Sequence, residues 1–132
     1  MALTYGNYDP FLPLKDGDQA FVVKVYDGDS LTLAWKDGEG NGVRIGCRLR
    51  GIDTPELRGS SSCERGLALR ARDRLESKVL GKAVTIRTPG TEKYGRVLAD
   101  LQCDDCASVA QHMLESKDAC RPYEGGKRLE WD

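Results

Sequence analysis

Five short stretches of the chain combine β-branched and aromatic residues with alternating apolar and polar positions, a pattern typical of β-strands buried on one side. The stretches are residues 20–26 (AFVVKVY), 30–35 (SLTLAW), 43–51 (VRIGCRLRG), 83–88 (AVTIRT) and 96–102 (RVLADLQ). The Asp27-Gly28 pair between the first two is typical of a hairpin turn, and residues 36–42 (KDGEGNG) predict an exposed loop.

A different period, with apolar residues four apart, predicts an amphipathic helix over residues 63–80. Its apolar stripe consists of Leu67, Ala71, Leu75 and Val79. Gly81 is expected to end this helix, and residues 107–116 predict a second one. Residues 54–56 (Thr-Pro-Glu) are typical of the entry to a helix or turn, with threonine as the cap and proline in the first turn.

Five strands with a helix inserted after the third predict an α+β, mainly β, fold: a five-stranded OB-fold barrel with two or three helices. A length of 132 residues suits one domain with one core. Residues 1–18 show no period and end in the turn-rich Lys-Asp-Gly-Asp. We therefore predict an N-terminal arm over residues 1–19 and a single domain over residues 20–132.

The net charge of −1 excludes a wholly basic nucleic-acid binder, but it hides an uneven distribution. Residues 44–74 carry 8 Arg and no Lys, against 4 Asp or Glu. Half of these arginines belong to the helical pattern, namely Arg65, Arg70, Arg72 and Arg74. Arg48 and Arg50 need another explanation, and the planar fork of an arginine suits phosphate better than the point charge of a lysine.

No run of the chain approaches the about 18 apolar residues that a membrane span needs, so we expect no membrane segment. The first twenty residues lack the basic start and apolar stretch of a secretory signal. The protein is expected either in the cytoplasm, as the chain stands, or outside it if a leader has been removed.

The five cysteines cannot all pair within the chain, so at least one thiol is free or intermolecular. Cys103 and Cys106 have the CxxC spacing of zinc and redox sites. The nearest further ligands are His112 and Cys120, and no second CxxC is present. We interpret the pair as a hairpin turn, with or without a disulfide, rather than as a zinc site. His112 is the only histidine, which excludes enzymes built on several.

Three segments concentrate charged residues where turns would expose them: residues 27–30 (DGDS), 48–56 (RLRGIDTPE) and 93–96 (KYGR). Each alone is explained by a turn. Together they supply what phosphodiester hydrolysis needs, because positive charge must gather around the phosphorus before water can attack. Aspartates are hard oxygen ligands for a divalent cation, arginine forks bind phosphate, and a further carboxylate accepts a proton from water.

On this reasoning Asp29 and Asp53 suit a metal ion, Glu56 suits the general base, and Arg48 with Arg96 suits the phosphate. The motifs VVKVYDGDSLTL, RLRGIDTPE, EKYGRVLADL and CRPYEGGKR, in this order, resemble the staphylococcal nuclease family over roughly residues 20–124. The family has an OB-type barrel that carries helices, in agreement with the strand pattern. Nine residues follow Tyr123 in the sequence, so we expect the long basic carboxyl-terminal helix of the family to be missing here.

The resemblance implies Ca²⁺ as the cofactor, held by Asp29, Asp53 and the backbone carbonyl of Thr54. It implies that Arg48 and Arg96 clamp the scissile phosphate and that Glu56 acts as, or positions, the general base. Contacts to the substrate are implied for Lys93 and Tyr94, at a neighbouring phosphate, and for Tyr123, at a base or sugar. The family cleaves DNA and RNA at the P–O5′ bond and leaves 3′-phosphate ends.

Two other functions stay open: a non-catalytic nuclease-like module that binds nucleic acid or protein, and a plain OB-fold binder of single strands. A non-catalytic module would not need the complete set of ionic side chains. A binder of single strands would need aromatic side chains on the strands, on which bases can stack. We expect a monomer that cleaves DNA, RNA or both. Because the net charge is −1, substrate binding should be weak and salt-sensitive.

Overall fold

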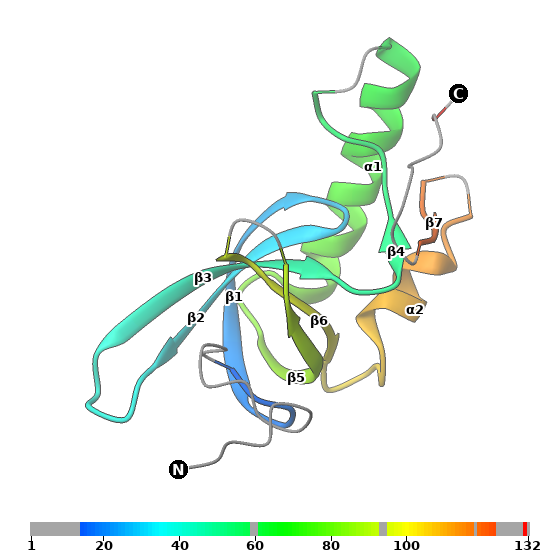
Figure 1. The fold of residues 1–132 in the computed structure, drawn as a ribbon. Helices are drawn as coiled ribbons and strands as arrows, with labels where there is room; N and C mark the ends of the chain where they lie inside the picture. Colours follow the sequence, from blue (N-terminus) through cyan, green and yellow to red (C-terminus); the bar gives the residue numbers. More distant parts are fainter. Residues whose placement is uncertain (1–13, 59–60, 93–94, 118, 124–130, 132) are drawn as a thin grey trace.

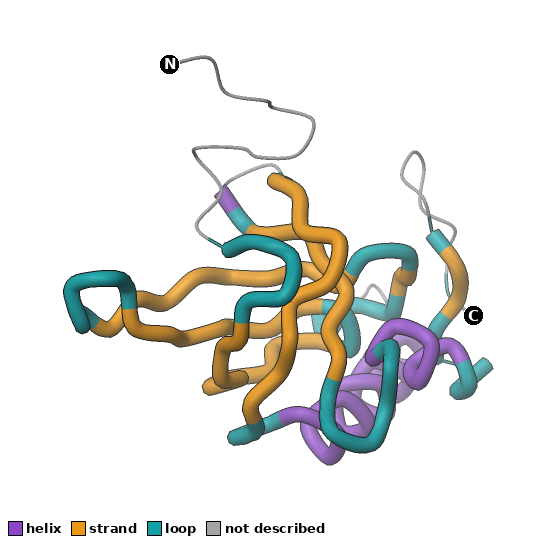
Figure 2. The backbone as a smooth tube through the Cα atoms, turned by 90° about the horizontal axis from the view of Figure 1, so that it is seen from below, coloured by secondary structure: helices purple, strands orange, loops and turns teal. Residues whose placement is uncertain are grey.

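The computed structural model describes residues 14–58, 61–92, 95–117, 119–123 and 131. Within them the strands are β1 (Gln19–Asp27), β2 (Ser30–Lys36), β3 (Gly42–Leu49), β4 (Ile52–Asp53), β5 (Ala83–Thr91), β6 (Val97–Gln102) and β7 (Arg121–Pro122). The helices are α1 (Ser62–Val79) and α2 (Val109–Leu114). Both lie on one side of the sheet, away from the projecting β2–β3 hairpin (Figures 1 and 2).

Five strands close a barrel in the order β1-β2-β3-β6-β5, which confirms the predicted α+β, mainly β, OB-like architecture. β1, β2 and β3 follow one another as antiparallel neighbours, and β5 pairs antiparallel with both β1 and β6. The barrel is closed by the parallel pairing of β3 with β6, in which Arg48 lies opposite Leu98. The two-residue strands β4 and β7 pair with each other outside the barrel.

The core lies inside the barrel and under the two helices. Alternate residues of the strands fill it, and α1 adds its apolar stripe; the largest fully buried side chains include Leu31, Leu33, Leu49, Ile86, Leu101 and Met113. In α1 the buried positions are Ala68, Ala71, Leu75 and Val79, while Leu67 is partly buried. The division into an arm over residues 1–19 and a domain over 20–132 stays a prediction; Gln19 begins β1 and Leu14 is buried in the core.

Of the two alternatives for residues 54–56, entry to a helix or to a turn, the structure shows the turn, which follows at Leu57 and Arg58. α1 starts at Ser62, and the Ser61 hydroxyl caps it by accepting a hydrogen bond from the Glu64 N–H at 3.0 Å. The Thr54 N–H instead donates to the carboxylate of Asp29 at 3.3 Å. A long-range acceptor, rather than a helix, thus holds the start of this segment. α2 is also shorter than predicted, since Ser108 caps it and it ends at Leu114.

No helix among the described residues is long and apolar enough to cross a membrane.

Candidate active site

Arg48 lies at the centre of a cluster of acidic residues where β3 ends. One of its terminal nitrogens is 3.3 Å from Asp29 Oδ2 and 3.5 Å from Asp53 Oδ1. The other donates to the backbone carbonyl of Ile52 at 3.3 Å. Register explains this meeting: Ser30, next to Asp29, pairs with Arg48 across β2 and β3, and β4 follows β3 after a two-residue turn. The two predicted metal ligands and a predicted phosphate ligand therefore lie together.

The Asp29 turn is packed against the rest of the protein through Gly28. A Cβ atom on Gly28 would lie 2.6 Å from the Ala71 Cβ of α1 and 3.0 Å from Cγ2 of Thr54. Behind the turn, the Leu49 N–H donates to the Asp29 carbonyl at 2.8 Å. Only glycine fits at position 28, because the backbone there lies against the side chains of Ala71 and Thr54. The turn that carries Asp29 is thus held between α1 and the segment that runs from the end of β3 to Thr54.

Gly28→Ala is expected to destabilise the protein by roughly 1–3 kcal/mol, because the added methyl group must displace α1 or Thr54. The free energy of unfolding, from urea titration, measures the effect. Gly38→Ala is the matched control, since a Cβ atom there meets nothing within 4 Å. Equal stability of the two variants would show that the turn can shift away from α1 without cost.

Glu92, which sequence reasoning did not select, joins the two predicted phosphate ligands. Its Oε2 lies 3.6 Å from Nε of Arg48, and its Oε1 is in close contact with a terminal nitrogen of Arg96. The other terminal nitrogen of Arg96 donates to the Ser30 hydroxyl at 3.4 Å, and that hydroxyl donates to Asp29 at 3.2 Å. The five side chains form a closed ring of polar contacts. The only signal in the sequence is that Glu92 precedes Arg96 by four residues.

The remaining predicted site residues differ in their placement. The ring of Tyr123 lies 5.3 Å from the Arg48 guanidinium carbon, and its N–H donates to the Gly51 carbonyl at 2.9 Å. Tyr123 therefore joins the cluster from the far end of the chain. Glu56 is exposed and lines a depression of about 300 Å³ together with Tyr26 and Asp27. Lys93 and Tyr94 lie outside the described residues.

Arg50 lies in the turn after β3 and, like Arg48, was not explained by the helical pattern. Its role in the structure is to support the fold. Its Nε donates to the backbone carbonyl of Thr88 at 3.0 Å, and its guanidinium packs on Gly90. The side chain fastens the end of β3 to the bulge of β5, where the register shifts between Arg87 and Gly90. Of Arg48 and Arg50, only Arg48 therefore contacts the acidic cluster.

Two comparisons with known proteins bear on this cluster. The family described as "Staphylococcal nuclease homologue" matches residues 46–121, more than half of the chain. The chain belongs to this family. It is also 32% identical, over 95 residues, to an "Uncharacterized endonuclease" of Escherichia coli. That match covers 72% of this chain and 55% of the relative, so the chain spans about half the length of the curated relative it matches.

The acidic cluster of this staphylococcal nuclease homologue fits a calcium ion. Asp29 and Asp53 are buried and turn carboxylate oxygens toward one guanidinium nitrogen, so a positive charge already lies between them. Carboxylate and carbonyl oxygens are the donors that Ca²⁺ prefers. Asp29, Asp53 and the carbonyl of the adjoining Thr54 would hold the ion. A separate group with metal-ligand chemistry, Cys103, Asp105 and Cys106, offers sulfur and belongs to another part of the molecule.

Burial raises the pKa of Asp29, with the neighbouring Asp53 and Asp27 adding to the rise and the Arg48 guanidinium opposing it. The folded protein then binds a proton at Asp29 more tightly than the unfolded chain does. Stability consequently falls as the pH rises from the ordinary carboxyl range, near 3.8, through the raised pKa. At neutral pH the ionised Asp29 costs stability in the metal-free homologue.

Asp29→Asn is therefore expected to raise the thermal midpoint of the metal-free protein at pH 7, and the gain should shrink as the pH falls toward 4. Calorimetry in the presence of a chelator across this pH range measures both effects. Asp37→Asn is the control, because Asp37 is exposed in the β2–β3 turn and its carboxyl pKa is lowered by backbone hydrogen bonds. A lower midpoint for Asp29→Asn at pH 7 would mean that the Arg48 ion pair outweighs burial.

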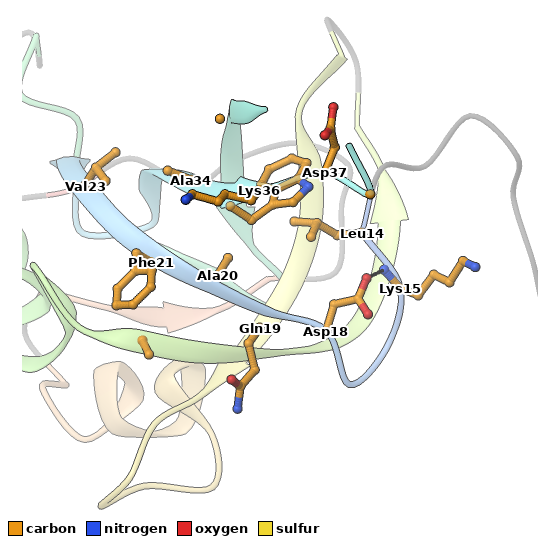
Figure 3. Close-up of a pocket in the computed structure, with 14 residues that line it drawn as sticks. Leu14, Lys15, Asp18, Gln19, Ala20, Phe21, Val23, Ala34, Lys36 and Asp37 are labelled. Atoms are coloured by element: carbon orange, nitrogen blue, oxygen red, sulfur yellow. Dashed lines mark hydrogen bonds between the residues drawn. The ribbon is translucent and has the colours of Figure 1, made fainter. Parts of the chain in front are cut away.

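A cavity among the described residues lies away from the acidic cluster. It measures about 1010 Å³ and is lined by residues of β1, the β2–β3 hairpin and the segment before β1, among them Leu14, Phe21 and Trp35 (Figure 3). Its lining contains none of the predicted site residues. This cavity is therefore separate from the predicted site.

Proposed function

We propose that the protein is a Ca²⁺-dependent nuclease that hydrolyses phosphodiester bonds of DNA, RNA or both. Water attacks phosphorus, the 5′-oxygen leaves, and 3′-phosphate ends result. Membership of the nuclease family and the relative named an endonuclease support a nuclease. The observation that carries the proposal is the position of Arg48, which contacts both buried aspartates on one side and, through Glu92, is linked to Arg96 on the other.

Arg48 and Arg96 bind the phosphate, because two guanidinium forks converge on the single carboxylate of Glu92, an anion that accepts the same charge-assisted hydrogen bonds. Both forks gain in strength as negative charge grows on the phosphoryl oxygens in the transition state. A calcium ion held by Asp29, Asp53 and Thr54 would add positive charge at the same phosphate.

Glu56 takes the proton from the attacking water. As the new P–O bond forms, the P–O5′ bond breaks and the 5′-oxygen leaves with the electron pair. The assignment of Glu56 is supported by its position two residues after Thr54, whose N–H is hydrogen-bonded to Asp29. Its exposure in the depression beside Tyr26 keeps its carboxylate accessible to water. Tyr123 packs on the Arg48 guanidinium, and Tyr123, Lys93 and Tyr94 bind the flanking nucleotides.

The test is cleavage of a 5′-labelled single-stranded DNA, and of the matching RNA, by the monomeric protein with Ca²⁺ and with chelator. We expect cleavage with Ca²⁺ only, and products whose mobility changes on phosphatase treatment, as 3′-phosphate ends require. Equal loss of substrate in both reactions would reject calcium dependence. Binding without cleavage would favour the alternative, a non-catalytic nuclease-like module.

A further inference from the structure

The hairpin between β6 and α2 brings two cysteines together. Their sulfur atoms are 2.7 Å apart. Cys103 and Cys106 form an antiparallel bridge in which each backbone N–H donates to the carbonyl of the other, at 3.0 and 3.2 Å. Residues paired in this way have Cα atoms about 5.5 Å apart, within the range that a disulfide spans. The backbone therefore already holds the two thiols in position to be joined.

The surroundings of the pair favour a disulfide over a metal ion. Asp105 could serve as a third ligand, because the three ligand atoms all lie within 4.8 Å of one another. However, Nζ of Lys78 lies 3.0 Å from Asp105 Oδ2, so this carboxylate already has a cation partner that repels a second one.

We propose that Cys103 and Cys106 are a site of disulfide formation that closes the β6–α2 hairpin. Cys106 is half-buried and Cys103 buried, so a small oxidant such as oxidised glutathione meets Cys106 first. The Cys106 thiolate attacks a glutathione sulfur, and one glutathione leaves as a thiol. Cys103 then displaces the second glutathione from Cys106. The two protein thiols lose two electrons and two protons, and one oxidised glutathione becomes two thiols.

The closed hairpin would fasten α2 to the barrel at a point remote from the acidic cluster. Asp100 of β6 already bonds the Ser108 hydroxyl and, at 3.0 Å, the Ala110 N–H at the start of α2. Cys103 follows β6, whereas Arg96 precedes it. Oxidation is therefore expected to restrict the unfolded chain and raise the resistance to urea, and to leave nuclease activity unchanged.

The experiment oxidises the full chain with glutathione disulfide, alkylates it under denaturing conditions and maps the peptides by mass spectrometry. We expect two fewer alkyl groups than in the reduced protein, a Cys103–Cys106 linkage, and a higher urea midpoint that reduction reverses. Cys63→Ser, at an exposed cysteine of α1, should retain both effects, and Cys106→Ser should lose both. Full alkylation after oxidation, a linkage to another cysteine, or stoichiometric zinc that Cys106→Ser removes would each overturn the proposal.

A second inference rests on the proposed function and on a different observation, the contacts of Glu92. Its two carboxylate oxygens face two different arginines, the same pair assigned to the phosphate. Its side chain is only 18% exposed, so water screens these contacts little. In the substrate-free protein a carboxylate thus occupies the position between Arg48 and Arg96 that a phosphate needs.

The geometry points to Glu92 as a positioning residue that holds the two arginines in substrate-free protein and is displaced by phosphate. Two anions cannot share one pair of guanidinium groups without strong repulsion, so phosphate must break the Glu92 contacts. Glu92 therefore lowers the affinity of the protein for phosphate, and hence for a nucleic-acid strand. In the substrate-free protein it also keeps the guanidinium groups of Arg48 and Arg96 close together.

The test measures the dissociation constant of inorganic phosphate by calorimetry in the presence of a chelator. Glu92→Gln is expected to bind phosphate about tenfold more tightly than the wild type, because the competing charge is removed. Glu92→Asp, which keeps the charge, should stay close to the wild type. Glu115→Gln is the control, since Glu115 pairs with Arg74 at 3.7 Å, outside the site.

Weaker or unchanged phosphate binding in Glu92→Gln would overturn this inference. Either result is expected if Glu92 only supports the two arginines and does not compete with phosphate. The experiment needs no cleavage, so its failure is distinct from failure of the proposed function. A protein that binds phosphate as expected but leaves DNA intact would contradict the nuclease proposal alone.

Discussion

Glu56→Gln is expected to lower kcat for DNA cleavage by about 10²- to 10⁴-fold, the usual contribution of a general base, while oligonucleotide affinity stays within about twofold. The carboxamide has the shape of the carboxylate but cannot accept the proton of the attacking water. The side chain lies in a surface depression beside Tyr26 and Asp27 rather than in the core, so the variant should fold normally. Single-turnover cleavage with saturating Ca²⁺ measures the chemical step directly.

Glu39→Gln is the matched control for this experiment, since Glu39 is exposed in the β2–β3 turn. A variant that cleaves at the wild-type rate would remove Glu56 from the mechanism and leave the base unassigned. A loss of affinity without a loss of kcat would assign Glu56 to substrate binding instead.

The barrel could be predicted from the sequence because each of its strands is a local pattern. Alternation over residues 30–35 and 43–51 is set by the burial of one face, and β2 and β3 show it as expected. The closure of the barrel depends on the parallel pairing of β3 with β6, in which Cys47 lies opposite Val97. This pairing joins segments far apart in the sequence, so the local periodicity of either strand does not predict it. The same pairing places Arg48 near the β5–β6 connection.

The acidic cluster could be predicted only in part, because local patterns show some of its residues and long-range strand pairing brings in the others. Asp29, Arg48 and Asp53 stand next to turns, and their chemistry is apparent from residue type and order. Glu92 looks like an ordinary charge before a turn, and its role appears only when β5 and β6 pair, with Thr91 opposite Val97. The β4–β7 pairing is equally invisible in the sequence, because two residues per strand are too few for any period.

Arg96→Lys is expected to lower kcat/KM by about 10²- to 10³-fold, although the positive charge is kept. Arg96 uses two different nitrogens, one toward Glu92 and one toward the Ser30 hydroxyl, so its fork spans two anchoring points. A lysine ammonium is a single point charge and cannot face a phosphate and Ser30 together.

Steady-state cleavage of single-stranded DNA, with Arg44→Lys on the exposed face of β3 as the control, measures this difference. The thermal midpoint should stay near that of the wild type, because the Arg96 side chain is 39% exposed and its ion pair contributes little to stability. Ionic strength separates charge from geometry: if charge alone mattered, the lysine variant, which keeps that charge and is screened to the same extent, would match the wild type at low and at high salt. A deficit that is the same at low and high salt would show that the phosphate is recognised by the shape of the guanidinium. Wild-type rates in Arg96→Lys at every salt concentration would show that the guanidinium fork of Arg96 is not needed, and would leave Arg48 as the single described arginine whose fork joins the buried aspartates to the substrate.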